Sequence, residues 1–224
     1  INYPNTGDRT VRSIEAGSLT LTPLAGGIGT ELNPLIIKVG LGGVNATTPL
    51  GYSMYYGAAE NSSLNLQTLN SGMDIYANAL TGGLNTTGAV SARRDIFATS
   101  DQSMTGLNFN AGANVSLSSI RGSIKGIKVS AGNGSARLDA DGDIALTSLT
   151  SNKDVVASAG LGITATVASA GRDLNFRAEG GSATGTTWSA GEDLDVLTLG
   201  SLSDISTTMA SASTGALTLT AGGS

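Results

Sequence analysis

The sequence predicts an all-β fold, a right-handed parallel β-helix with coils of about 20 residues. The clearest copies of the repeat run from Ser169 to Phe176 and from Ser189 to Val196, so that Leu194 is the counterpart of Leu174. A short alternating strand at this period is typical of a solenoid whose repeats bury their apolar faces against one another. The turns leave no room for crossover helices, and connections between parallel strands are right-handed as a rule.

Looser copies extend the repeat along most of the chain. Strands preceded by Asp or Asn recur at one or two such intervals, at Ile75, Ile96, Val115, Val155 and Leu174. Further apolar residues lie about half a coil from three of these positions, at Leu64, Leu107 and Ile163. Each coil is therefore expected to carry two strands. The spacing shortens between Val115 and Ile144, where we expect extra strands at Ile124, Ile127–Val129 and Ala136–Leu138. One coil there is therefore expected to be shorter or differently cornered.

Alternation within each strand predicts which side chains face the core. Leu174 and Phe176 should point inward, as should Leu194 and Val196 of the next copy, while Asn175 and Asp195 should face water. The Ala170–Gly171 pair and its counterpart Ala190–Gly191 are expected to stack at a corner where only small residues fit.

Regularity divides the chain into two parts. Residues 1–62 form an irregular start of the β-helix or an insertion, because Pro23, Pro34 and Pro49 interrupt the rhythm. Within this part, Glu15–Thr22 resembles one copy of the repeat and Leu35–Val39 is expected to be a buried strand. Residues 63–224 form regular repeats that end with a strand at Leu217. Neither end of the sequence offers a cap, so we expect a fragment of a longer chain in which coils continue on both sides.

Composition narrows the classes of function. Charged residues make up 13% of the chain and aromatic residues 4%, and there are 32 glycines. Such bias could indicate disorder, but a hydrophobic content of 40% and the regular strands argue against it. The absence of Cys and His removes thiol nucleophiles, disulfides and the commonest metal ligand. A net charge of −5 disfavours nucleic acid as a partner, and no apolar run is long enough for membrane insertion.

One acidic cluster, Asp139, Asp141 and Asp143, could in principle carry chemistry. Calcium is one interpretation, although the order of the residues differs from a helix-loop-helix calcium loop. Paired carboxylates that cut a polysaccharide, with Arg121, Lys125 and Lys128 nearby, are another. We expect instead solvated outer positions, with Asp143 as the Asp of a repeat before Ile144. The Arg93–Arg94 pair is likewise expected at a solvated corner, where ion pairs contribute little.

The densest aromatic patch in the sequence consists of Tyr52, Tyr55 and Tyr56. The rings either cover a gap in the core of an irregular coil or form a platform for a ligand, and we favour the first interpretation. With no convergent reactive groups in view, we expect no enzyme and no catalytic, cofactor-binding or metal site.

The repeats Ser169–Phe176 and Ser189–Leu194, the segment Ala140–Leu146 and the closing Leu217–Gly223 resemble those of filamentous haemagglutinins and related two-partner secretion exoproteins. The resemblance covers residues 63–224 well and residues 1–62 poorly. It implies a right-handed β-helical shaft, secreted to the cell surface of a Gram-negative bacterium. Family members act in attachment and biofilm formation.

The expected function is therefore a structural shaft of a surface adhesin that displays a tip away from the cell. Its partners would be adjoining coils of the same long chain or end-to-end neighbours, and a host-surface protein or glycan. Two alternatives stay open: a self-assembling extracellular filament subunit, and a β-helix that binds or cleaves polysaccharide.

Overall fold

The computed structural model describes residues 14–222, which form two parallel sheets and no helix. The first sheet contains, in order, β1 (Ile14–Ala16), β3 (Leu35–Val39), β5 (Met54–Ala58), β7 (Ile75–Ala79), β10 (Ile96–Ser100), β12 (Val115–Ser119), β14 (Ala136–Ala140), β16 (Val155–Ala159), β18 (Leu174–Ala178), β20 (Leu194–Thr198) and β22 (Leu217–Ala221). The second contains β2 (Leu19–Leu21), β4 (Val44–Thr47), β6 (Leu64–Ser71), β8 (Leu84–Thr86), β9 (Val90–Ala92), β11 (Met104–Ala111), β13 (Ile124–Ala131), β15 (Ile144–Ser151), β17 (Ile163–Ala170), β19 (Ala183–Ala190) and β21 (Ile205–Ala212). Within residues 14–222, no segment is a helix long and apolar enough to cross a membrane.

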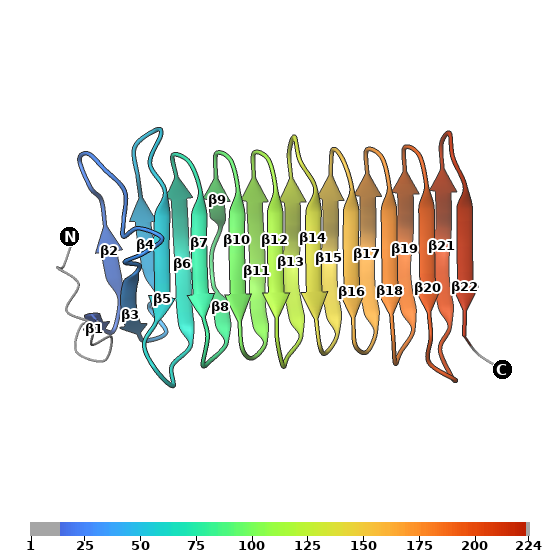
Figure 1. Cartoon of the computed structure of the whole chain (residues 1–224), viewed down its shortest axis with the longest axis horizontal. Helices are drawn as coiled ribbons and strands as arrows, with labels where there is room; N and C mark the ends of the chain where they lie inside the picture. Colours follow the sequence, from blue (N-terminus) through green and yellow to red (C-terminus); the bar gives the residue numbers. More distant parts are fainter. Residues whose placement is uncertain (1–13, 223–224) are drawn as a thin grey trace.

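The strands stack into a right-handed solenoid of about ten coils, as the sequence predicted. Strands of the first sheet run downward at the front of Figure 1, and strands of the second sheet run upward behind them. The chain advances from left to right as it winds, which makes the coil right-handed. The expected strand at Leu35–Val39 is present as β3.

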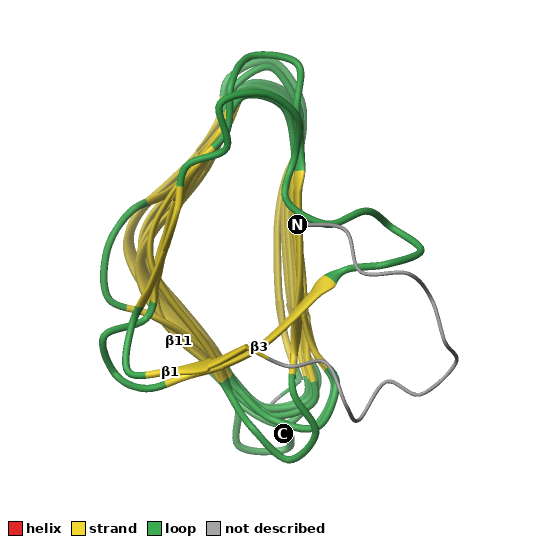
Figure 2. Cartoon of the chain, turned by 90° about the vertical axis from the view of Figure 1, so that its left-hand side faces the viewer, coloured by secondary structure: helices red, strands yellow, loops and turns green. Residues whose placement is uncertain are grey.

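Each coil has three faces rather than two, because the long strands of the second sheet bend. In β6, the exposed residues Gln67 and Thr68 stand side by side between the buried residues Leu66 and Leu69. Strict alternation resumes on either side of this pair, so the two halves of the strand face the core from different directions. The outline seen along the axis is accordingly close to a triangle (Figure 2).

Register follows the repeat of the sequence. The strand starts predicted from the sequence pair in one row along the first sheet, which runs through Ile75, Ile96, Val115, Ala136, Val155, Leu174 and Leu194. Ala136 fills the place between Val115 and Val155, so the short coil expected between Val115 and Ile144 is wrong. The residues there form two strands of ordinary length, β13 and β14. Ile124 and Ala136, which the expectation counted as starts of additional strands, are the ordinary starts of β13 and β14.

Some predicted repeats lie in the other sheet. Ile144, which follows Asp143, begins β15 in the second sheet, and Leu19 begins β2 there. Leu107 is an inner residue of β11, and Met104 is the residue equivalent to Leu64 and Ile163. The assignments of Ile144 and Leu19 were wrong by half a coil, because the turns before both sheets use the same small and acidic residues. Leu107 lies in the second sheet as expected, three residues after the start of its strand.

The core fits large side chains against small ones along the axis. Trp188 is fully buried, and its neighbours in the same row of the second sheet are Ala168 and Ala210. Its indole Nε1–H donates to the Ala165 carbonyl oxygen at 2.9 Å, and its ring meets Phe176 edge-on with centroids 5.4 Å apart. The indole therefore fills the space that alanines leave in the adjoining coils and keeps its polar atom satisfied.

Small residues stack at the corner that follows β17 and β19, as expected for the Ala-Gly pairs. Ala170 and Ala190 pair in register and are buried. A Cβ at Gly191 would overlap the carbonyl oxygen of Gly171, and one at Gly171 would overlap that of Asn152. The stack of coils thus selects glycine at these positions through contact with the preceding coil.

The first coils join the same sheets through longer connections. Residue Ile28 forms an isolated parallel bridge to Met54, and β3 pairs with the second half of β5. Two separate pieces of chain therefore share one strand position, and the segment between them includes a turn closed by Thr30 and Asn33. Residues 1–13 of the irregular part predicted at 1–62 lie outside the described residues, as does the end of the closing repeat at Gly223.

The substitution Leu174→Asp should lower the free energy of unfolding by several kcal/mol, because it places an unpaired carboxylate in the core beside Phe176. Asn175→Asp is the matched control, because Asn175 points out of the same strand. Urea unfolding followed by Trp188 fluorescence measures both variants. Equal unfolding midpoints for the two variants would contradict the assignment of Leu174 to the core side and Asn175 to the outer side of the strand.

Candidate functional site

A column of polar side chains runs along the corner that precedes the first sheet. Several residues before strands of this sheet carry an oxygen that accepts from the backbone N–H of the counterpart one coil later. Asp95 Oδ1 accepts from the Asn114 N–H at 2.9 Å, and Asn114 Oδ1 accepts from the Ser135 N–H at 3.0 Å. Asp193 Oδ1 continues the pattern to the Ala216 N–H at 2.7 Å. The column satisfies amides that the sheets do not reach.

The corner that precedes the second sheet has the same construction. Ser103 Oγ accepts from the Ser123 N–H, Ser123 Oγ from the Asp143 N–H, and Asp143 Oδ1 from the Gly162 N–H, each at 3.0 Å. The carboxylate of Asp143 therefore serves the stacking of coils. Asp and Ser occur at both corners, and Asn at the first, because each places an acceptor within reach of the next coil.

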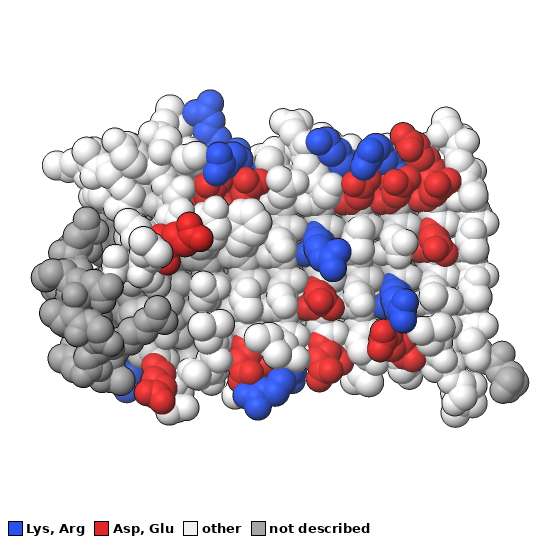
Figure 3. Space-filling view, viewed as in Figure 1, with Lys and Arg blue, Asp and Glu red and all other residues white. Residues whose placement is uncertain are grey.

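Arginine side chains clamp three of the corner carboxylates across one coil. Arg94 donates two hydrogen bonds to Asp74, from Nε at 2.8 Å and from Nη2 at 2.5 Å. Arg172 holds Asp154 in the same way at 2.9 and 2.7 Å, and Arg121 holds Asp101 at the other corner. Figure 3 shows blue and red side chains side by side along both edges of this face. We call these two-point pairs arginine forks. Each has a fixed geometry that an isolated surface ion pair lacks.

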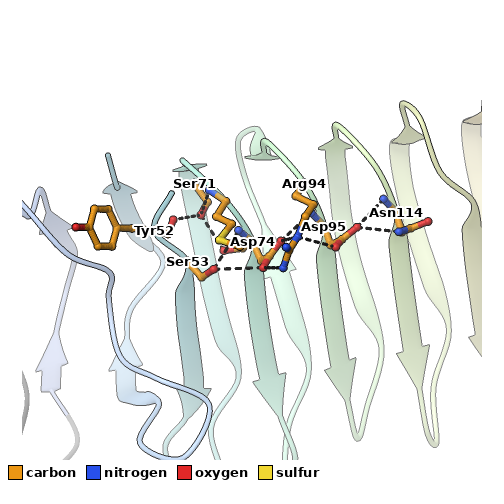
Figure 4. A network of polar contacts seen from close by, with 8 residues as sticks. Tyr52, Ser53, Ser71, Asp74, Arg94, Asp95 and Asn114 are labelled. Atoms are coloured by element: carbon orange, nitrogen blue, oxygen red, sulfur yellow. Dashed lines mark hydrogen bonds and ion pairs between the residues drawn. The ribbon is translucent and has the colours of Figure 1, made fainter. Parts of the chain in front are cut away.

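Asp74 is the most enclosed of these carboxylates, with only 2% of its side chain exposed. Besides Arg94, it accepts from the Ser53 hydroxyl at 3.3 Å and from the Asp95 N–H at 3.2 Å (Figure 4). Arg94 also lies 3.1 Å from Asp95. The expected pairing of the Arg93–Arg94 corner with acidic neighbours is confirmed for Arg94, but one of the two carboxylates, that of Asp74, is buried rather than solvated. Only the acidic residue one coil earlier could have signalled this.

The forks also shift the ionisation of their carboxylates. Hydrogen bonds from Arg121 hold the pKa of Asp101 below its ordinary value, and those from Arg172 do the same for the pKa of Asp154. Both groups therefore favour the charged form in the folded state.

The predicted acidic cluster is dispersed by the fold. Asp139 points outward from β14, Asp141 lies in the following turn, and Asp143 accepts from the next coil. Among residues 14–222 no group of three or more acidic side chains could hold a metal ion. The calcium interpretation therefore gains no support from the geometry.

The cations considered for polysaccharide cleavage do not join the acidic cluster. Arg121 is paired with Asp101, and Lys125 and Lys128 belong to β13 in the second sheet, whereas Asp139 belongs to the first. The arrangement does not bring these carboxylates and cations together around one point, which general acid and base work requires.

The three predicted tyrosines separate completely. Tyr56 is fully buried, and burial raises the pKa of its hydroxyl. Tyr52 lies in the turn before β5, near Ser71 (Figure 4). Tyr55 points outward and stacks on Tyr76, with ring centroids 4.4 Å apart and planes 2° from parallel. The ring of Tyr76 stacks in turn on Phe97 at 5.0 Å and 15°.

We call Tyr55, Tyr76 and Phe97 the aromatic ladder. It lies on the outer face of the first sheet, on β5, β7 and β10. The sequence contained its signal, because the three rings follow one another at a constant interval of one coil. Reading Tyr55 together with its neighbours Tyr52 and Tyr56 concealed that period.

No family model, curated protein or solved structure matches this chain.

Removing one acceptor from a corner column should weaken the stack. We expect Asn114→Ala to lower the free energy of unfolding by about 1–2 kcal/mol, because the Ser135 N–H and the Asp95 carboxylate each lose a partner. Asn133→Ala changes an exposed turn residue of the adjoining coil and serves as control. If chemical denaturation gives both variants the same loss, the column does not stabilise the corner.

The depressed pKa of Asp154 makes part of the stability depend on pH. A carboxylate with a lowered folded-state pKa contributes stability above its unfolded pKa of about 3.9, and that contribution is lost as the pH falls through the folded value. We expect Arg172→Met to destabilise the protein at pH 7 and to approach the wild type near pH 3, measured by urea midpoints. Arg177→Met, from the exposed pair with Glu179, should show no such convergence. If the urea midpoints of Arg172→Met and wild type differ by the same amount at all pH values, the Asp154 carboxylate does not cause the pH dependence.

Proposed function

We propose that this chain is a length of extracellular structural shaft that belongs to a bacterial surface adhesin and holds a binding tip away from the cell. The observation that carries the proposal is the axial network: polar columns at two corners of the coil, with arginine forks across them. These contacts tie each coil to the next and use many of the charged groups for stacking. A polypeptide built in this way resists bending and needs no ligand to be stable.

Several properties of the sequence support the location. The repeats resemble those of filamentous haemagglutinins and other two-partner secretion exoproteins, which cross the outer membrane of Gram-negative bacteria. The chain has no cysteine, so it can pass through a pore unfolded without forming disulfides. The proposed partners are accordingly further coils of the same long chain, together with the host-surface protein or glycan that its tip would bind.

The proposal assigns no catalysis to the chain. Asp143 serves the stack, and the cations considered together with the acidic cluster are paired or belong to the other sheet. A shaft that mediates attachment or biofilm formation requires length and stiffness from this segment, and it requires few of its outward side chains.

Replacing the segment within its parent protein tests the proposal. We expect cells in which residues 14–222 are exchanged for an unrelated right-handed β-helix of the same number of coils to attach and form biofilm as the wild type does. Deleting the segment without replacement should reduce both. Antibody staining of the tip on intact cells controls for export. Attachment that is lost in the exchanged strain, with normal staining, would assign the binding to this segment and overturn its role as a passive shaft.

A further inference from the structure

The aromatic ladder stops at Phe97 with one ring face uncovered. Tyr76 covers the other face of Phe97, and the next residue in the same outward row is Ser116 on β12. A serine side chain is too short to cover a benzyl ring, and Phe97 is partly exposed accordingly. Tyr76 is stacked on both faces, by Tyr55 and by Phe97, and it covers one face of Tyr55. Phe97 is therefore the end of the ladder that faces the longer, polar part of the sheet.

Beyond Ser116 the row continues with Arg137 on β14. Two coil spacings of about 4.8 Å separate Phe97 from Arg137, which leaves room for one ring between them. A second outward row lies two residues further along the same three strands and contains Thr99, Ser118 and Asp139. Phe97, Ser116, Ser118, Arg137 and Asp139 are therefore neighbours on the outer face of the sheet, and we call this group the Phe97 notch. It has an aromatic wall at Phe97, a floor of two serine hydroxyls and a charged wall of Arg137 and Asp139.

The charged wall is available for a ligand. Arg137 and Asp139 are both exposed, and within residues 14–222 neither takes part in an ion pair, whereas three other arginines are committed to forks. A shallow depression beside the notch is lined by Ser118 and Asp139, and further along by Asp141, Ser158 and Glu179. The notch therefore opens onto further polar surface along the axis of the solenoid.

We propose that the Phe97 notch binds one pyranose ring of a saccharide. A pyranose has an apolar C–H face that can lie on the free face of Phe97, and hydroxyls around its edge that can bond to Ser116, Ser118, Arg137 and Asp139. An aromatic side chain of a peptide could also stack on Phe97, but it has no ring of hydroxyls that could bond to Ser116, Ser118, Arg137 and Asp139. The saccharide site goes beyond the proposed shaft function and does not depend on it.

Saturation-transfer NMR with three probes, the methyl pyranosides of glucose, galactose and mannose, tests the site on the chain itself. We expect at least one probe to receive saturation, with a dissociation constant on the order of millimolar because a single ring is bound. Phe97→Leu should weaken binding roughly tenfold by removing the aromatic face, and Phe97→Tyr should retain it. Ser116→Tyr should abolish binding because a fourth ring would occupy the notch. Asn175→Tyr places the same ring elsewhere in the row, two coils beyond Arg137, and should leave binding unchanged.

Three results would overturn the proposal: no saturation of any probe, binding that survives both Phe97→Leu and Ser116→Tyr, or binding of phenylalanine amide at the notch in place of the sugars. The first two would leave the shaft function untouched, since the strain carrying the exchanged β-helix tests that function separately. Circular dichroism of each variant shows whether the solenoid is intact, and Phe97→Tyr provides a conservative change should Phe97→Leu unfold the local coil.

Discussion

Each coil of this solenoid is held to the next by hydrogen bonds along the axis, and at the corners the sheets alone do not supply them. The backbone turns there, and a buried or half-buried N–H without a partner would cost as much as a lost hydrogen bond. Backbone carbonyls of the neighbouring coil accept from many corner amides, and side-chain oxygens of Asp, Asn and Ser accept from others, one coil at a time. Because every acceptor must sit directly beside its donor, the corners require the same kind of residue at the same place in each coil, and the sequence repeat follows.

This constraint also explains where charge lies on the molecule. The carboxylates that cap amides lie close together from coil to coil, and arginines one coil later neutralise three of the corner carboxylates. The outer faces of the strands carry no such duty, so their side chains are mostly Ser, Thr and Asn with scattered charges (Figure 3). The aromatic ladder is an exception, since rings spaced by one coil on a parallel sheet stack on one another.

Much of this could be predicted from the sequence, because period and alternation are local patterns. Leu174, Phe176, Leu194 and Val196 are buried and Asn175 is exposed, as alternation requires. The phase of the repeat, meaning which of the two sheets each copy belongs to, was harder to predict. Both corners use the same acceptors, so the segment ending in Asp143 resembles a first-sheet turn although it precedes the second sheet.

Features that depend on neighbouring coils were the least predictable. The buried state of Asp74 depends on Arg94, one coil later, and the bend of the second-sheet strands depends on adjacent exposed residues such as Gln67 and Thr68. The sequence did suggest a possible ligand platform at Tyr52, Tyr55 and Tyr56, but it grouped rings by position in the chain. The fold groups rings by coil, which joins Tyr55 to Tyr76 and Phe97 instead.

Native-state hydrogen exchange of the corner amides tests most directly whether side-chain columns hold the coils together. The Asn114, Ser135 and Gly162 amides should exchange as slowly as amides in the middle of the sheets, because side-chain oxygens accept from them. Exchange as fast as that of the exposed loop residues Leu41 and Leu50 would contradict the account. The stack would then depend on its core and on backbone hydrogen bonds, in the sheets and at the corners.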